Sequence, residues 1–179
     1  MTDIDNFARL LFEEAKRFLE KGRESCGDGQ TAYLHAAINL GFSALEAHVN
    51  AIADELLIRK DNSLIDKSIL SEKDLKLNNG RFELTGQKIY RLQDRLEFLC
   101  RRYSNAPIDK NAAYWSHLKE AIDLRNHLTH PKNDPPKIRV ESAEKSLTAI
   151  LEILNELFVR IYKKGYPGFK RHLDSTMTF

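Results

Sequence analysis

The stretch that decides the fold spans residues 31–59 and reads TAYLHAAINLGFSALEAHVNAIADELLIR. Its apolar residues cover most of the circumference of a helix instead of forming one stripe. A helix of this kind is usually central in a bundle, and Gly41, Ala44 and Ala47 leave room for a close neighbour. Glu46 is a polar exception. Because an isolated buried carboxylate is costly, we expect Glu46 to pair with a basic group or to lie near a site.

Other parts of the chain have the three- and four-residue apolar spacing of amphipathic helices. These helices are expected over residues 3–23, 87–103, 111–130 and 142–164. Residues 61–86 have a weak pattern with a turn at Asn78-Asn79-Gly80, so we expect a solvated connection there. The sequence therefore predicts an all-α, up-and-down bundle of four to five long helices. It forms a single domain over residues 1–179, with a basic tail at about 165–179. We expect this tail to be frayed, with nucleic-acid binding by its basic and aromatic residues as the alternative.

Composition excludes several classes of protein. The chain has 179 residues, 42% hydrophobic and 30% charged, which is typical of a globular soluble protein and not of a disordered one. The net charge is +2, so any nucleic-acid surface must be a local patch. Cys26 and Cys100 form no metal-like pair. Asp3 and Asp5 stand where a signal peptide would be apolar, and no membrane-length apolar run follows, so we expect a cytoplasmic protein.

The densest group of side chains suited to chemistry is Arg125-Asn126-His127-Leu128-Thr129-His130, directly before Pro131. On a helix, Asn126 and His130 share a face, and so do His127 and His130. Arg125 precedes His130 by five residues and lies off that face. The two side chains therefore meet only if Pro131 displaces His130 from helical geometry, or if a second chain supplies the other half. The alternative is a solvated polar helix end.

The spacing of Arg125, four residues and His130, placed before the last long helix, resembles the signature of the HEPN superfamily. These are small all-helical domains found in prokaryotic toxins and phage-defence proteins. Asn126 fills the position after the arginine, where active members typically have a polar residue. The resemblance implies a metal-independent endoribonuclease that acts as a homodimer, with two motifs forming one composite cleft. It implies RNA as substrate, no cofactor, no metal and no membrane, and it suggests an antitoxin or regulatory partner.

This chemistry is physically reasonable for the residues of the motif. RNA supplies its own nucleophile, the 2'-hydroxyl, and needs a group that exchanges protons near neutral pH. His130 is the expected general base or acid. Arg125 supplies a fixed fork of donors for the developing phosphate charge. Asn126 is expected to orient the hydroxyl or His130. These three residues are the predicted catalytic set.

Three further residues are predicted to support the site or to bind substrate. Glu46 is a partner that can hold Arg125 in place. His127 is a candidate for an RNA contact, with a plain surface histidine as the alternative. Lys132 stands two residues after His130, where some toxin members have a tyrosine, so the subgroup regulated through that tyrosine is not expected.

Other classes of protein remain as alternatives. One is a non-catalytic HEPN-like module that binds RNA or nucleotide, or that only dimerises. A second is a helical interaction protein in which the motif is a polar cap. A third is a metal site built from His117, His127 and His130, for which the sequence offers only Asp123 as a nearby acidic ligand.

Overall fold

The computed structural model describes residues 3–131 and 137–179, and helices dominate this part of the chain. The elements are α1 (Asp3–Glu24), α2 (Gly27–Leu57), α3 (Leu64–Leu70), β1 (Lys73–Asn78), β2 (Arg81–Gln87), α4 (Leu92–Ser104), α5 (Ala113–Thr129), α6 (Val140–Tyr162) and the 3-10 turn η1 (Phe169–Arg171). The expectation of a mainly helical chain is confirmed, and the two strands were not expected. In the described ranges no helix is long and apolar enough to cross a bilayer.

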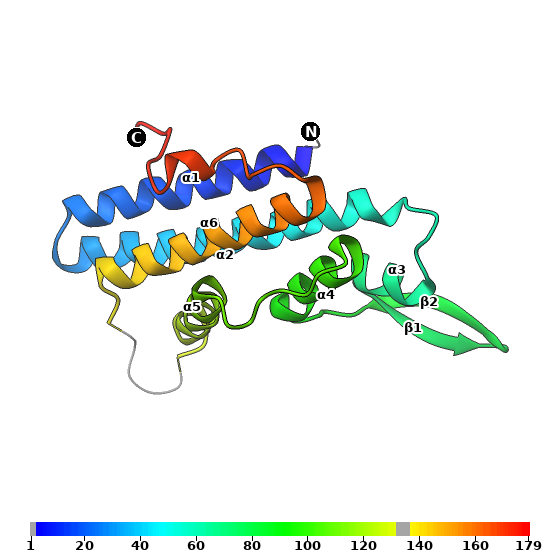
Figure 1. Ribbon diagram of the computed structural model, residues 1–179. Helices are drawn as coiled ribbons and strands as arrows, with labels where there is room; N and C mark the ends of the chain where they lie inside the picture. The colour runs from blue at the N-terminus through cyan, green and yellow to red at the C-terminus, as the bar shows by residue number, and fades with distance from the viewer. Residues whose placement is uncertain (1–2, 132–136) are drawn as a thin grey trace.

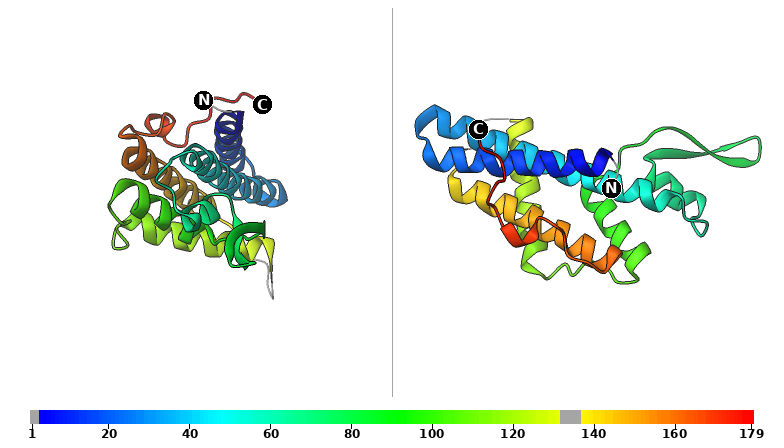
Figure 2. Two further views of the ribbon diagram at one scale, coloured as in Figure 1. Left: turned by 90° about the vertical axis from the view of Figure 1, so that its right-hand side faces the viewer. Right: turned by 90° about the horizontal axis from the view of Figure 1, so that it is seen from above.

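Three long helices, α1, α2 and α6, lie side by side, and α5 runs across them. Figure 1 shows these three lengthwise and α5 nearly end-on, whereas the left view of Figure 2 shows α5 lengthwise. The chain therefore departs from simple up-and-down order at α5. Figures 1 and 2 also show the two ends of the chain on the α1 side of the molecule.

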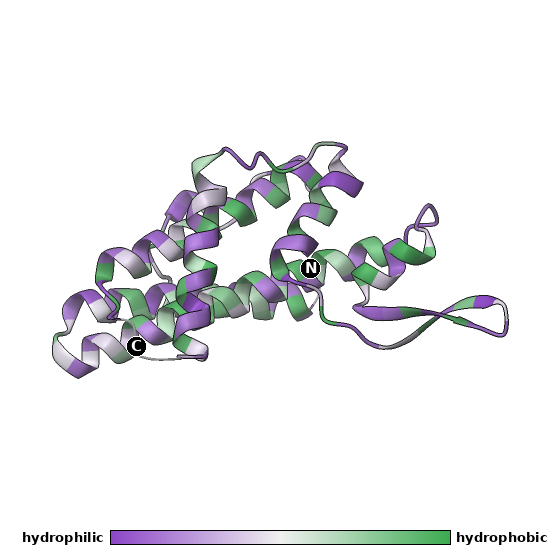
Figure 3. Cartoon of the chain, turned by 90° about the horizontal axis from the view of Figure 1, so that it is seen from below, coloured by the Kyte–Doolittle hydropathy of each residue, from purple (hydrophilic) through white to green (hydrophobic). Residues whose placement is uncertain are grey.

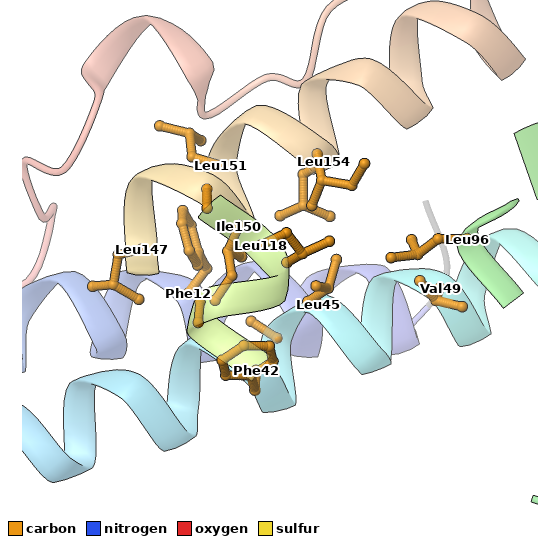
Figure 4. Packing of buried hydrophobic residues seen from close by; sticks show 14 of the residues in the cluster. Phe12, Phe42, Leu45, Val49, Leu96, Leu118, Leu147, Ile150, Leu151 and Leu154 are labelled. Atoms are coloured by element: carbon orange, nitrogen blue, oxygen red, sulfur yellow. The ribbon is translucent and has the colours of Figure 1, made fainter. Parts of the chain in front are cut away.

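Helix α2 is the central element, as its apolar circumference predicts. It packs against each of the other five α-helices of the described chain. Figure 4 shows side chains of different helices converging in the core, with Leu45 of α2, Leu118 of α5 and Ile150 of α6 pointing toward one another. Gly41 supplies the expected close approach, because a Cβ at this position would overlap the buried side chain of Leu147 on α6.

The segment between α2 and α4 is not the plain connection that the sequence suggested. Helix α3 begins at a capping box, in which the hydroxyl of Ser63 accepts from the Asp66 amide at 3.1 Å and the Ser63 amide donates to Asp66 at 2.8 Å. Strands β1 and β2 then form an antiparallel hairpin. Its tip is the predicted turn, with Asn79 and Gly80 at φ of 48° and 79°. Figure 3 shows hydrophilic and hydrophobic residues on both arms as the hairpin extends from the helices.

Helices α2, α4, α5 and α6 begin at other residues than expected, and the difference matters most for α4 and α6. Helix α4 begins at Leu92, because the residues up to Gln87 belong to β2. Ile89 therefore lies in the non-helical segment between β2 and α4, and 81% of the Ile89 surface is exposed. Helix α6 begins at Val140 with Arg139 as the N-cap residue, so Ser142 lies inside the first turn and does not cap the helix.

The basic tail is ordered against the bundle, so the expectation of a frayed end was wrong. Tyr166 is buried, and the segment after η1 returns along α1. The amide of Ser175 donates to Glu20 at 2.8 Å, and the amide of Thr176 donates to Glu13 at 2.7 Å. Arg17 donates to the carbonyl oxygen of Phe179. Carboxylates of α1 thus satisfy backbone donors of the tail.

Candidate functional site

Arg125 lies in the last turns of α5 and reaches across to α2. Its Nη2 donates to Oε1 of Glu46 at 2.7 Å, and its guanidinium carbon lies 5.2 Å from the centre of the Phe42 ring. The Nε atom is buried and has no hydrogen-bond partner among the described residues. Glu46, which the sequence expected to pair with a basic group or to lie near a site, is paired with Arg125. The ion pair and the ring fix the charge of Arg125 against the central helix.

Arg125 lines a cavity of about 660 Å³. The cavity lies between α2, α4, α5 and the segment that joins β2 to α4. Three of the predicted site residues line it, namely Arg125, Asn126 and Glu46. The other lining residues are Asn50, Glu72, Gln87, Ile89, Tyr90, Arg91, Leu92, Gln93, Arg95, Ile122 and Asp123. The cavity therefore combines residues that are far apart in the sequence and has both charged and apolar walls.

The two histidines of the motif lie elsewhere. His130 is the C-cap residue of α5 at φ −136° and ψ 61°, outside helical geometry as expected next to Pro131. Its amide donates to the carbonyl of Asn126 at 2.9 Å, and its side chain is exposed. His127 is exposed as well, and neither histidine lines the cavity. The structure thus brings Arg125, Asn126 and Glu46 together and leaves both histidines at the open helix end.

Lys132 lies outside the described residues. In the ranges that the structure does describe, no group of three or more histidine, cysteine, aspartate or glutamate side chains is arranged to hold a metal ion. His117, the third histidine of the metal-site alternative, lies in the second turn of α5 and is partly buried.

Sequence reasoning missed a second arginine of the cavity, Arg95. Only 6% of its surface is exposed, its Nη1 donates to Oδ1 of Asn50 at 2.8 Å, and it lies 3.3 Å from Glu72. Burial lowers the pKa of Arg95. The nearby carboxylates raise it, and Glu72 has the largest effect among them. The missed signal is its position three residues after Leu92, on the apolar stripe of α4.

A buried histidine marks a second cavity, of about 560 Å³, between the start of α1 and the end of α6. His48 of α2 lines it and is 2% exposed, and its Nε2 lies 3.2 Å from the hydroxyl of Tyr166. The Nδ1 atom has no hydrogen-bond partner in the described part of the chain. Burial lowers the pKa of His48 to about 4, so its ring is neutral at physiological pH.

Comparison with known proteins identifies no relative of this chain. No family model, no curated protein sequence and no solved structure matches it. Any assignment of function therefore depends on the geometry and chemistry of the residues described above.

Proposed function

We propose that the protein is a metal-independent endoribonuclease of the HEPN type, with a composite active site at a homodimer interface. The observation that supports this most directly is the position of the Arg125 side chain. Its guanidinium is held at 2.7 Å by Glu46 beside an open cavity, and His130 is exposed just beyond the end of the same helix. The motif residues are thus accessible to a polymeric substrate.

The chemistry of Arg125 suits a phosphate. The ion pair with Glu46 occupies only Nη2, and neither Nη1 nor Nε has a hydrogen-bond partner among the described residues. Nη1 therefore remains for a phosphate oxygen, where a fixed guanidinium stabilises the charge of the transition state, whereas Nε is buried within the protein. Asn126 lines the same cavity and carries an amide that orients a hydroxyl by donating or accepting.

The separation of Arg125 and His130 within one chain favours a site shared by two copies. Arg125 is directed to α2 and lines the cavity, whereas His130 does not line it. An arginine of one protomer beside the histidine of its partner gives both functions in one cleft. The motif precedes α6, the last long helix of a mainly helical chain, as the resemblance to the HEPN superfamily implies. On that resemblance we propose a toxin or phage-defence role restrained by an antitoxin or regulatory partner.

Cleavage of a structured RNA in the presence of EDTA tests this proposal. The products are expected to have 2',3'-cyclic phosphate and 5'-hydroxyl ends, because the 2'-hydroxyl is the nucleophile. His130→Ala is expected to lower the rate by about 100-fold or more, and His172→Ala, an exposed histidine of the tail, serves as the matched control. No cleavage by the wild-type protein, or equal cleavage by His130→Ala, contradicts the assignment.

The second candidate is a non-catalytic HEPN-like module that binds RNA or nucleotide, or that only dimerises. It is favoured by the same separation of Arg125 from His130, if no second copy completes the site. This candidate predicts RNA binding that Arg125→Ala weakens, with no cleavage in any condition. A gel-shift assay beside the cleavage assay distinguishes the two functions.

A further inference from the structure

Five polar side chains of the cavity beside Arg125 make no side-chain hydrogen bond to the described part of the chain, and four of them are exposed to solvent. They come from three elements, with Gln87 at the end of β2, Arg91 and Gln93 at the start of α4, and Asp123 and Asn126 on α5. The other charged residues of the cavity are already paired, as the Arg125–Glu46 and Arg95–Glu72 contacts described above show. These unpaired groups, together with the free Nη1 donor of Arg125, are therefore the ones that can contact a ligand.

The kind of group that fits them follows from their donors and acceptors. Arg91 only donates, Asp123 only accepts, and the three amides do both. A phosphate only accepts, and the carboxylates of Asp123, Glu46 and Glu72 in the same cavity disfavour a second anion. A cation is disfavoured by the arginines. The set therefore matches a neutral group that carries donors and acceptors side by side, which is the character of a nucleobase.

The apolar residues of the cavity indicate a flat ligand. Ile89 is 81% exposed at the rim, in a segment where folding does not require an isoleucine, and Leu92 and Ile122 lie in the walls. Bases are commonly held between apolar or planar side chains that cover their faces. The volume of about 660 Å³ lies within the range of cavities that bind small organic molecules.

We propose that this cavity is a base-recognition subsite, which holds one nucleobase of the RNA strand whose phosphate lies at Arg125. Guanine is the base that fits best, because its N1–H and N2–H groups can donate to Asp123 while its O6 and N7 accept from Arg91. This inference rests on the proposed ribonuclease function and adds sequence preference to it. Cleavage is directed to phosphates next to guanine.

Titration of the full-length chain with the four ribonucleosides tests the subsite directly. Nucleosides carry no phosphate and cannot be cleaved, so the measurement reports only recognition of the base. Guanosine is expected to bind most tightly, and Arg91→Ala and Asp123→Asn are each expected to weaken it by about tenfold or more. Arg101→Ala is the matched control, since Arg101 is an exposed arginine of α4 that does not line the cavity. Tighter binding of another base overturns the guanine assignment.

A second pair of variants tests the apolar contact with the base, which does not depend on the polar side chains. Ile89→Ala is expected to weaken guanosine binding by several-fold, about the effect of uncovering one face of a base. Ile58→Ala, which removes an isoleucine of similar exposure (85%) outside the cavity, is expected to have no effect. Circular dichroism of each variant checks that the fold is intact.

Mapping of the cleavage sites separates failure of the subsite from failure of the ribonuclease. Guanosine binding without any RNA cleavage keeps the subsite and overturns the proposed function. RNA cleavage whose base preference is unchanged in Arg91→Ala and Ile89→Ala, with no nucleoside bound, overturns the subsite and keeps the ribonuclease. Loss of base preference in these variants, with cleavage retained, supports both.

Discussion

Nη2 of Arg125 on α5 lies 2.7 Å from Oε1 of Glu46 on α2, so the polar motif is tied directly to the central helix of the bundle. The pair is only partly buried, with 26% of the Arg125 side chain and 47% of the Glu46 side chain exposed. Solvent screening at such exposure limits its contribution to stability to about 1 kcal/mol or less. The main effect of the pair is positional, because it fixes where the charge of Arg125 lies.

Removing Glu46 is therefore expected to affect activity more than stability. Glu46→Ala should lower the free energy of unfolding by no more than about 1 kcal/mol, and RNA cleavage by roughly tenfold through loss of orientation. Glu46→Gln, which keeps an acceptor oxygen, should retain more activity. Urea unfolding and single-turnover cleavage measure the two effects. Glu120→Ala, which breaks the exposed pair with Lys145 away from the cavity, should leave cleavage unchanged. Full activity of Glu46→Ala would contradict the positional role.

Mixing two inactive variants tests whether the active site is shared between copies. If Arg125 of one protomer acts with His130 of the other, a heterodimer of Arg125→Ala and His130→Ala contains one intact site. A mixture is then expected to recover about a quarter of the wild-type rate, because half of the dimers are mixed and each has one of two sites. Recovery is measured after denaturation and refolding of the two chains together. A mixture as inactive as its components would show that both residues act from the same chain, or that no such site exists.

Those features of the fold that depend on local pattern could be predicted from the sequence. The apolar circumference of residues 31–59 indicated that this helix is central, and Gly41 indicated a close neighbour; both are seen in α2. Glu46 was expected to pair because a buried lone carboxylate is costly, and it does pair, but 47% of its side chain is exposed, so burial is not the reason. The departure of His130 from the helix followed from Pro131.

Features that depend on tertiary contacts could not be predicted in this way. Strands β1 and β2 are an exception, because Leu75 and Leu77 on one strand and Phe82 and Leu84 on the other alternate with polar residues on either side of Asn79-Gly80. This is a local hairpin pattern that the interpretation of the sequence overlooked. The ordering of the tail depends on Glu13 and Glu20, about 155 residues earlier in the chain. The cavity likewise combines residues of α2, α4 and α5, and no local pattern in the sequence reports that they converge.

Close packing at Gly41 makes a specific prediction for stability. Gly41→Ala should destabilise the protein by about 1–2 kcal/mol, because the new Cβ overlaps the buried side chain of Leu147, and the higher helix propensity of alanine only partly offsets this. Gly29→Ala is the matched control, since nothing lies near its Cβ position in the first turn of α2. It should be neutral or slightly stabilising. Chemical unfolding measures both variants, and equal stability of the two would show that α2 and α6 can separate without cost.

Buried His48 predicts a loss of stability in mild acid. Burial holds its pKa at about 4 in the folded protein, below the ordinary value of 6.5 that applies when the chain is unfolded. The unfolded chain therefore binds a proton first as the pH falls, and the contribution of His48 is complete above pH 6.5 and is lost progressively between pH 6.5 and pH 4. Glu13, whose pKa is lowered from 4.5 in spite of burial, acts mainly below that value, so the range from pH 6.5 to pH 5 reports chiefly on His48.

The wild-type protein is accordingly expected to lose roughly 2 kcal/mol of stability between pH 7.5 and pH 5 because of His48. His48→Gln, which has no charge at either pH, should be less stable at pH 7.5 because it disturbs the contact with Tyr166, but it should lose less stability on acidification. Urea unfolding of both proteins at the two pH values gives the difference. Since the other histidines are present in both, they cancel in the comparison. An equal loss in the two proteins would mean that His48 is hydrated or paired at low pH, and that the cavity around it opens to water more readily than its burial indicates.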